Sequence, residues 1–136
     1  MGPLVHVVLA SSVPRQAALT AAGVALPAPT QGIFLIDTGA SHTSVDPSLL
    51  APLKLQPTGT IPVHTSSTNG APVSCNQYDV ELAIGAPNGL PFTVPALPVT
   101  EANLAAQGIF GLIGRDVLSR CTFIYNGVTG LYTLCY

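Results

Sequence analysis

The hydrophobic pattern along the chain predicts several short strands divided by turns. Residues 4–10 alternate loosely between apolar and other side chains and are rich in β-branched residues, which is typical of a strand. Residues 32–36 are wholly apolar, as expected of a strand that is covered on both faces. Further extended runs occupy residues 59–67, 72–84, 90–99 and 109–114, and residues 121–136 predict a closing hairpin. This succession predicts a mostly β domain, built as a closed barrel or a sandwich.

Helices are expected to be few and short. Residues 44–50 predict one, because Asp46 suits the N-cap and Pro47 suits the first helical position. Residues 14–31 are rich in alanine and proline and predict a loop or an extended arm with at most one helical turn. The other expected helical segments are a turn over 100–108 that ends at Gly108 and a brief helix over 115–120.

Composition narrows the class of protein. The 136 residues predict a single domain over 1–136, and 13 glycines and 13 prolines fit a turn-rich β protein. Only 7% of residues are charged, and the net charge is −2 with four lysines and arginines. We therefore expect no binding to nucleic acid and no attraction to an anionic membrane surface.

The cysteines and histidines suggest no metal or cofactor. There are three of each, with no C-x-x-C pair and no close ligand spacing; they are Cys75, Cys121, Cys135, His6, His42 and His64. Free thiols in a reducing compartment are the default for such cysteines. The chain starts without a positively charged segment, and its first apolar run is too short to cross a bilayer. A cytoplasmic protein is therefore expected, with a secreted origin as the alternative.

Asp37 is the candidate for chemistry. It directly follows an apolar strand, where an unpaired carboxylate costs several kcal/mol. Gly39 allows a sharp turn after it, and the Thr38 and Ser41 hydroxyls can hydrogen-bond across that turn. A strand-end aspartate that merely caps a turn is the simpler alternative. The sequence lacks a G-x-S-x-G elbow and a phosphate-binding glycine loop, so those chemistries are excluded.

Two further features accompany Asp37. One is the run Leu112-Ile113-Gly114-Arg115-Asp116, and the other is a central hairpin with Asn69-Gly70 at its turn. Together with Asp37-Thr38-Gly39-Ala40 they resemble the retropepsin-like aspartic proteases over residues 30–136. The resemblance implies a closed β fold with a flap hairpin, at about residues 59–84, and one or two short helices. It also implies an active site that forms when two copies of the chain meet.

The need for a second copy also follows from the residues. Hydrolysis by a carboxylate pair needs two aspartates that share a proton, and this chain has one Asp-Thr-Gly. The expected catalytic residues are Asp37, Thr38 and Gly39, with the Thr38 hydroxyls bonded across the dimer as the resemblance implies. The expected substrate contacts are Ala40, Ser41, Phe110 and Ile113, with Thr68, Asn69 and Gly70 at the flap tip.

Three residues near the motifs have other expected roles. Asp116 is expected to brace Arg115, and a backbone carbonyl is expected to replace the acidic partner that Arg115 has in the family. His42 would either tune the pH dependence or substrate preference, or be a solvated bystander.

The favoured function is a homodimeric aspartic endopeptidase that hydrolyses extended, largely apolar peptides without a cofactor. The alternative is a dimer of the same fold that is weakly proteolytic or silent and serves as a binding or dimerisation module. An unrelated small β domain is a third reading, which a strictly monomeric protein would favour.

Overall fold

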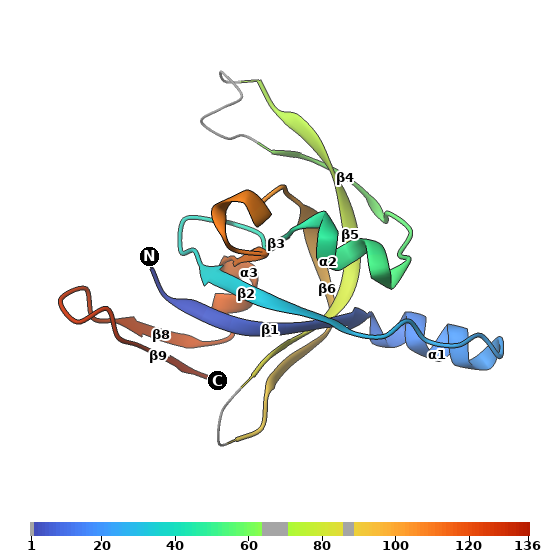
Figure 1. Ribbon diagram of the computed structural model, residues 1–136, viewed down its shortest axis with the longest axis horizontal. Helices are drawn as coiled ribbons and strands as arrows, with labels where there is room; N and C mark the ends of the chain where they lie inside the picture. The colour runs from blue at the N-terminus through green and yellow to red at the C-terminus, as the bar shows by residue number, and fades with distance from the viewer. Residues whose placement is uncertain (1, 64–70, 86–88) are drawn as a thin grey trace.

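A closed barrel forms the centre of the computed structural model, which describes residues 2–63, 71–85 and 89–136 (Figure 1). The main sheet has seven strands in the order β1-β2-β7-β3-β6-β5-β4, and an additional β1–β5 pairing closes six of them into a ring. β4 lies outside the ring and pairs with β5. The prediction of a mostly β, closed fold is confirmed. The barrel strands are β1 (Leu4–Ser11), β2 (Thr30–Ile36), β3 (Ser44–Val45), β5 (Val73–Ile84), β6 (Phe92–Glu101) and β7 (Gly111–Ile113).

Alternate residues of the strands fill the barrel. On β1, Val5, Val7 and Leu9 are buried while His6 is exposed, as the period of a strand requires. Two short helical segments, α2 (Pro47–Leu50) and η1 (Ala51–Leu53), add three leucines to the same core. The largest side chains with essentially no exposed surface are Phe34, Leu9, Leu53, Leu82 and Ile113.

The parallel pairing of β2 with β7 brings the two sequence motifs together. Phe34 pairs with Gly111 and Ile36 with Ile113, so the chain leaves both strands at the same end. A Cβ atom at Gly111 would lie 2.2 Å from the Phe34 ring, so only glycine allows this packing. Residues 37 and 114 are therefore neighbours although 77 positions separate them.

Residues 14–31 were predicted to be a loop or an extended arm, and this is wrong in part. The nine-residue helix α1 (Val13–Ala21) begins there, with the Ser12 side chain accepting a hydrogen bond from the Arg15 amide. The serine cap, a proline in the first turn and the following alanines all favour a helix start. None of the α1 residues is buried, so no hydrophobic periodicity signalled the helix.

The remaining elements match the expectations closely, with shifted ends. The helix expected over 44–50 begins only at Pro47, because Ser44 and Val45 pair with β6 and β7 instead. The hairpin of residues 121–136 is confirmed as a separate two-stranded sheet. The other elements are β4 (Gly59–Val63), η3 (Ala105–Gln107), α3 (Arg115–Leu118), β8 (Thr122–Tyr125) and β9 (Tyr132–Cys135).

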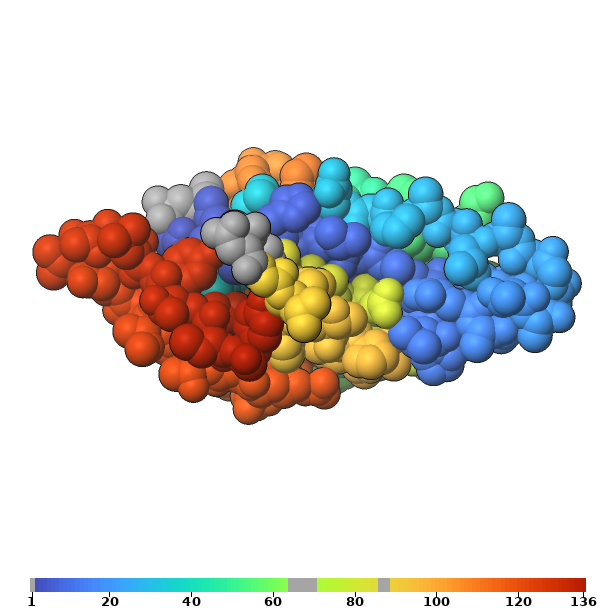
Figure 2. Space-filling view, turned by 90° about the horizontal axis from the view of Figure 1, so that it is seen from below, coloured from blue at the N-terminus to red at the C-terminus, as the bar shows by residue number. Residues whose placement is uncertain are grey.

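The β8–β9 hairpin and the α1 region extend from opposite ends of the molecule (Figures 1 and 2). The Tyr132 hydroxyl donates a hydrogen bond to the Leu4 carbonyl and so ties the hairpin to β1. Burial raises the pKa of Tyr132. Much of the hairpin's apolar surface faces solvent, since Ile124, Val128 and Leu131 are 61%, 97% and 71% exposed.

Within the described residues, no helix is long and apolar enough to cross a membrane. Cys75, Cys121 and Cys135 are all free thiols, and burial raises the pKa of Cys121.

Candidate active site

The turn after β2 holds the Asp37 carboxylate in a fixed position. The Asp37 amide donates to the Ile113 carbonyl at 2.9 Å, which continues the β2–β7 pairing by one residue. Its Oδ1 accepts a hydrogen bond from the Gly39 amide at 2.9 Å, and its carbonyl accepts one from the Ala40 amide at 3.2 Å. Asp37 is half-buried, whereas Thr38 and Gly39 are exposed. The carboxylate is therefore oriented by the backbone and open on one side.

Arg115 clamps the far side of this turn. Its Nη1 donates to the Thr38 carbonyl and its Nη2 to the Ser41 hydroxyl, both at 2.9 Å. The Arg115 amide also donates to the Ala40 carbonyl at 2.9 Å. The expectation that a backbone carbonyl replaces an acidic partner of Arg115 is confirmed.

Asp116 was expected to brace Arg115, but it holds Thr43 instead. Its Oδ2 accepts from the Thr43 amide at 2.9 Å and its Oδ1 from the Thr43 hydroxyl at 2.7 Å. The same hydroxyl accepts a hydrogen bond from the Gly114 amide at 3.1 Å. The correction has a simple cause: the Arg115 guanidinium is directed to the turn after Asp37, while the Asp116 carboxylate also accepts a hydrogen bond from the Val117 amide within α3.

Gly114 lets the two segments meet. A Cβ atom there would lie 2.6 Å from the carbonyl carbon of His42 and 2.7 Å from its oxygen. Both are backbone atoms that cannot rotate away, so the sequence run Leu-Ile-Gly-Arg-Asp requires glycine at this position.

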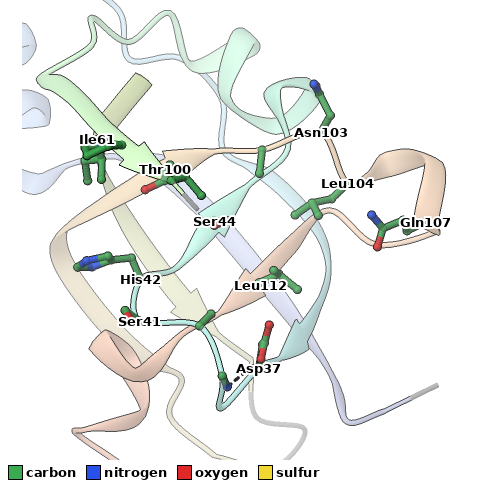
Figure 3. Close-up of a pocket in the computed structure, with 15 residues that line it drawn as sticks. Asp37, Ser41, His42, Ser44, Ile61, Thr100, Asn103, Leu104, Gln107 and Leu112 are labelled. Carbon is green, nitrogen blue, oxygen red and sulfur yellow. Dashed lines mark hydrogen bonds between the residues drawn. The ribbon is translucent and has the colours of Figure 1, made fainter. Parts of the chain in front are cut away.

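A pocket of about 980 Å³ opens beside Asp37 (Figure 3). Its wall comes from the turn after β2, from β4, from the segment that joins β6 to η3, and from β7. The lining residues are Asp37, Gly39, Ala40, Ser41, His42, Ser44, Ile61, Pro62, Val63, Thr100, Ala102, Asn103, Leu104, Gln107 and Leu112.

A model of the aspartyl protease family matches residues 9–117, which include Asp37 and the run through Gly114. The chain belongs to this family. The resemblance to the retropepsin-like aspartic proteases is thereby confirmed. No curated protein matches the sequence.

The substrate contacts expected from the sequence fall into three groups in the structure. Ala40 and Ser41 line the pocket. Ile113 has no exposed surface and Phe110 is outside the lining, packed against the core, so neither faces the pocket. For Ile113 the core placement follows from β7, whose alternate residues Gly111 and Ile113 are buried. The expected flap tip of Thr68, Asn69 and Gly70 lies outside the described residues.

Sequence reasoning missed the wall formed by residues 100–107. Thr100, Asn103, Leu104 and Gln107 line the pocket, yet the sequence showed only a helical turn there. Nothing in their side-chain types pointed to a site, because they are neutral and carry no catalytic chemistry.

Asp46 holds that wall in place. It is 4% exposed, and its Oδ2 accepts hydrogen bonds from the Leu104 and Ala105 amides at 2.7 and 2.8 Å. Its Oδ1 accepts from the amide and hydroxyl of Ser48, as expected of the N-cap of α2. Burial alone would raise the pKa of Asp46, but the bonds from Ser48, Leu104 and Ala105 outweigh it and lower the pKa to about 2.

Among the described residues of the chain, no group of three histidine, cysteine or acidic side chains could hold a metal ion. The described residues of the pocket offer one oriented carboxylate, the imidazole of His42 and neutral hydrogen-bonding groups.

Proposed function

We propose that the protein is an aspartic endopeptidase that acts as a homodimer. The observation that carries the proposal is the Asp37 carboxylate, which the Gly39 amide orients beside a pocket of about 980 Å³. Arg115 fixes the same turn from the opposite side. A turn that only ended a strand would not need this second set of bonds.

A second copy is needed because the chain supplies one such carboxylate. Two aspartates that lie side by side hold one proton between them, since two like charges at about 3 Å cannot both ionise. A two-fold axis through the turn brings Asp37 of each copy to the same place. Thr38 is exposed on this turn, where its hydroxyl could bond to the other copy.

The hydrolysis then proceeds in two steps. The ionised carboxylate takes a proton from a water molecule as the water oxygen bonds to the carbonyl carbon of the peptide. The protonated carboxyl of the other copy gives its proton to the carbonyl oxygen. The tetrahedral intermediate collapses when its C–N bond breaks: the departing nitrogen takes a proton from the carboxyl that accepted one from water, and a hydroxyl of the intermediate returns a proton to the other carboxylate, which restores the shared proton. The products are one carboxyl end and one amino end.

The β8–β9 hairpin supports self-association. Five of its large apolar side chains face solvent. They are Ile124, Tyr125, Val128, Leu131 and Tyr136. Exposed apolar surface on a chain with so little charge favours association.

Two features support an extended, largely apolar peptide as substrate. The described residues of the pocket lining are neutral apart from Asp37 and His42. Apolar surface comes from Ile61, Val63, Leu104 and Leu112. β4 pairs with β5 on one edge, and its other edge carries no strand within the described residues. An extended peptide can add to such an edge through backbone hydrogen bonds.

The test compares wild type with Asp37→Asn on a diverse peptide library from about pH 3.5 to 7.5, the range in which a carboxyl pair that shares a proton titrates. Wild type is expected to cleave, with activity lost at higher pH as both carboxyls ionise, and Asp37→Asn is expected to be inactive. Asp79→Asn, on β5 outside the pocket lining, is the matched control and should cleave like wild type.

Sedimentation of the same samples decides the oligomeric part. A strict monomer would contradict the proposal, because no second Asp37 would be present. A dimer that cleaves nothing would contradict it too and would favour a binding module on the same fold.

A further inference from the structure

Among the described residues, the wall of the pocket beside Asp37 contains one basic side chain, that of His42. Of the described residues that line it, Asp37 and His42 are the ones that can carry a charge, and all others are neutral. The ring of His42 lies beside Ser41 and points away from the Asp37 carboxylate (Figure 3). The two ionisable groups thus occupy different parts of the pocket.

The backbone of His42 is fixed while its ring is available. Gly114 packs against the His42 carbonyl, and the next amide, that of Thr43, donates to Asp116. The His42 side chain is exposed and makes no hydrogen bond with the described part of the chain. A side chain on a rigid base that bonds to none of the described residues is available to a ligand in the pocket.

The charged groups of the neighbouring elements are engaged elsewhere. Arg115 bonds to Thr38 and Ser41, and Asp116 bonds to Thr43. Glu101, at the end of β6, lines a different hollow of about 130 Å³ together with Lys54 and Tyr78. β7 and β4, residues 111–113 and 59–63, contain no titratable side chain. No carboxylate on these elements therefore neutralises a proton on His42.

We propose that His42 selects peptides with an aspartate or glutamate at the position that lies against it. The inference rests on the proposed function and names a preference of that same site. Imidazole ordinarily gains its charge between about pH 8 and pH 5, within the acid range expected for a carboxylate pair. A charged imidazole beside a peptide carboxylate forms a charge-assisted hydrogen bond, which is stronger than a neutral one.

The test measures kcat/KM for matched peptide pairs that differ only by glutamate or glutamine. First, wild type and His42→Gln cleave a peptide library at about pH 5, where imidazole is mostly charged. Comparing the two identifies the peptide position at which a preference for acidic residues depends on residue 42. The ratio of the two kcat/KM values cancels the titration of the Asp37 pair, which acts on both peptides alike. We expect a glutamate preference of about tenfold at pH 5 that becomes smaller at the highest pH, up to about 7, at which wild type still cleaves.

Two variants separate a charge effect from a structural one. His42→Gln should give a ratio near one at both pH values, and His42→Lys should keep the glutamate preference at the higher of the two. His6→Gln, an exposed histidine on β1 outside the pocket, is the matched control and should keep the wild-type ratios.

The outcomes distinguish the two proposals. Cleavage by wild type with equal ratios in all variants would overturn the role of His42 and leave the protease standing. Cleavage by no variant would overturn the proposed function, and the selectivity with it.

Discussion

Asp46→Asn is expected to destabilise the protein at neutral pH but much less in acid. The Asp46 carboxylate accepts four hydrogen bonds, two on each oxygen, from Ser48, Leu104 and Ala105. An asparagine keeps one oxygen and places an NH₂ group where the other oxygen was. Two buried donors would then face a donor, and each such unsatisfied group costs about 1–3 kcal/mol.

The size of the acid effect follows from the lowered pKa. The pKa of Asp46 falls from its ordinary value of 3.8 to about 2 in the folded protein. This difference corresponds to about 2 kcal/mol in the free energy of unfolding. Because the folded pKa is the lower one, the unfolded chain binds the proton first. The contribution is therefore complete above pH 4 and disappears as the pH falls towards 2.

Urea unfolding at fixed protein concentration, repeated between pH 7 and pH 2, checks this prediction. The free energy of unfolding of wild type should fall towards that of Asp46→Asn as the pH drops, so the gap between them should narrow by about 2 kcal/mol. Asp79→Asn, on β5, is the control, since the Asp79 carboxylate accepts no hydrogen bond from the described part of the chain. A gap that stays constant with pH would refute the reasoning, because the four bonds would then not favour the ionised form.

Three further changes test the site and the interface. Gly114→Ala should cost more than about 2 kcal/mol in urea unfolding, because its Cβ meets backbone atoms, whereas Gly127→Ala, in open space, should cost little. Arg115→Lys cannot make both bonds of the guanidinium fork, so peptide cleavage should fall while the unfolding midpoint changes little. Val128→Ser combined with Leu131→Ser should raise the dimer dissociation constant in sedimentation by tenfold or more, since both side chains are largely exposed on the monomer.

Strands and turns could be predicted because their signals are local. The apolar run before Asp37 and the alternation on β1 specified strands, and Asp46 with Pro47 specified the start of α2. The family could be predicted because Asp37, Gly39 and the run through Gly114 together resemble the motifs of the aspartic proteases. Each of these residues has its own constraint: the Asp37 carboxylate must be oriented, Gly39 makes a tight turn, and Gly114 packs closely against another backbone segment.

The rest depended on contacts between distant segments. Asp116 binds Thr43, 73 positions away, and no local pattern distinguishes that partner from Arg115 beside it. Ile113 could belong to the core or to a substrate pocket, and only the direction of β7 decides between them. The wall at residues 100–107 is held by Asp46 through backbone amides, which leave no trace in the sequence.

Because β4 lies outside the ring, it can open locally while the ring opens only on global unfolding. Each of the six barrel strands has a neighbour on both edges. Within the described residues β4 pairs only with β5, in a register that runs from Gly59–Gln77 to Val63–Val73. Releasing β4 frees Ile61, Pro62 and Val63 from the pocket wall without breaking any pair of the ring. Hydrogen exchange at β4 amides should consequently proceed by local opening, while amides of β1 and β2 await global unfolding. A long peptide could then enter the pocket where β4 has separated from β5, while the six strands of the ring remain paired.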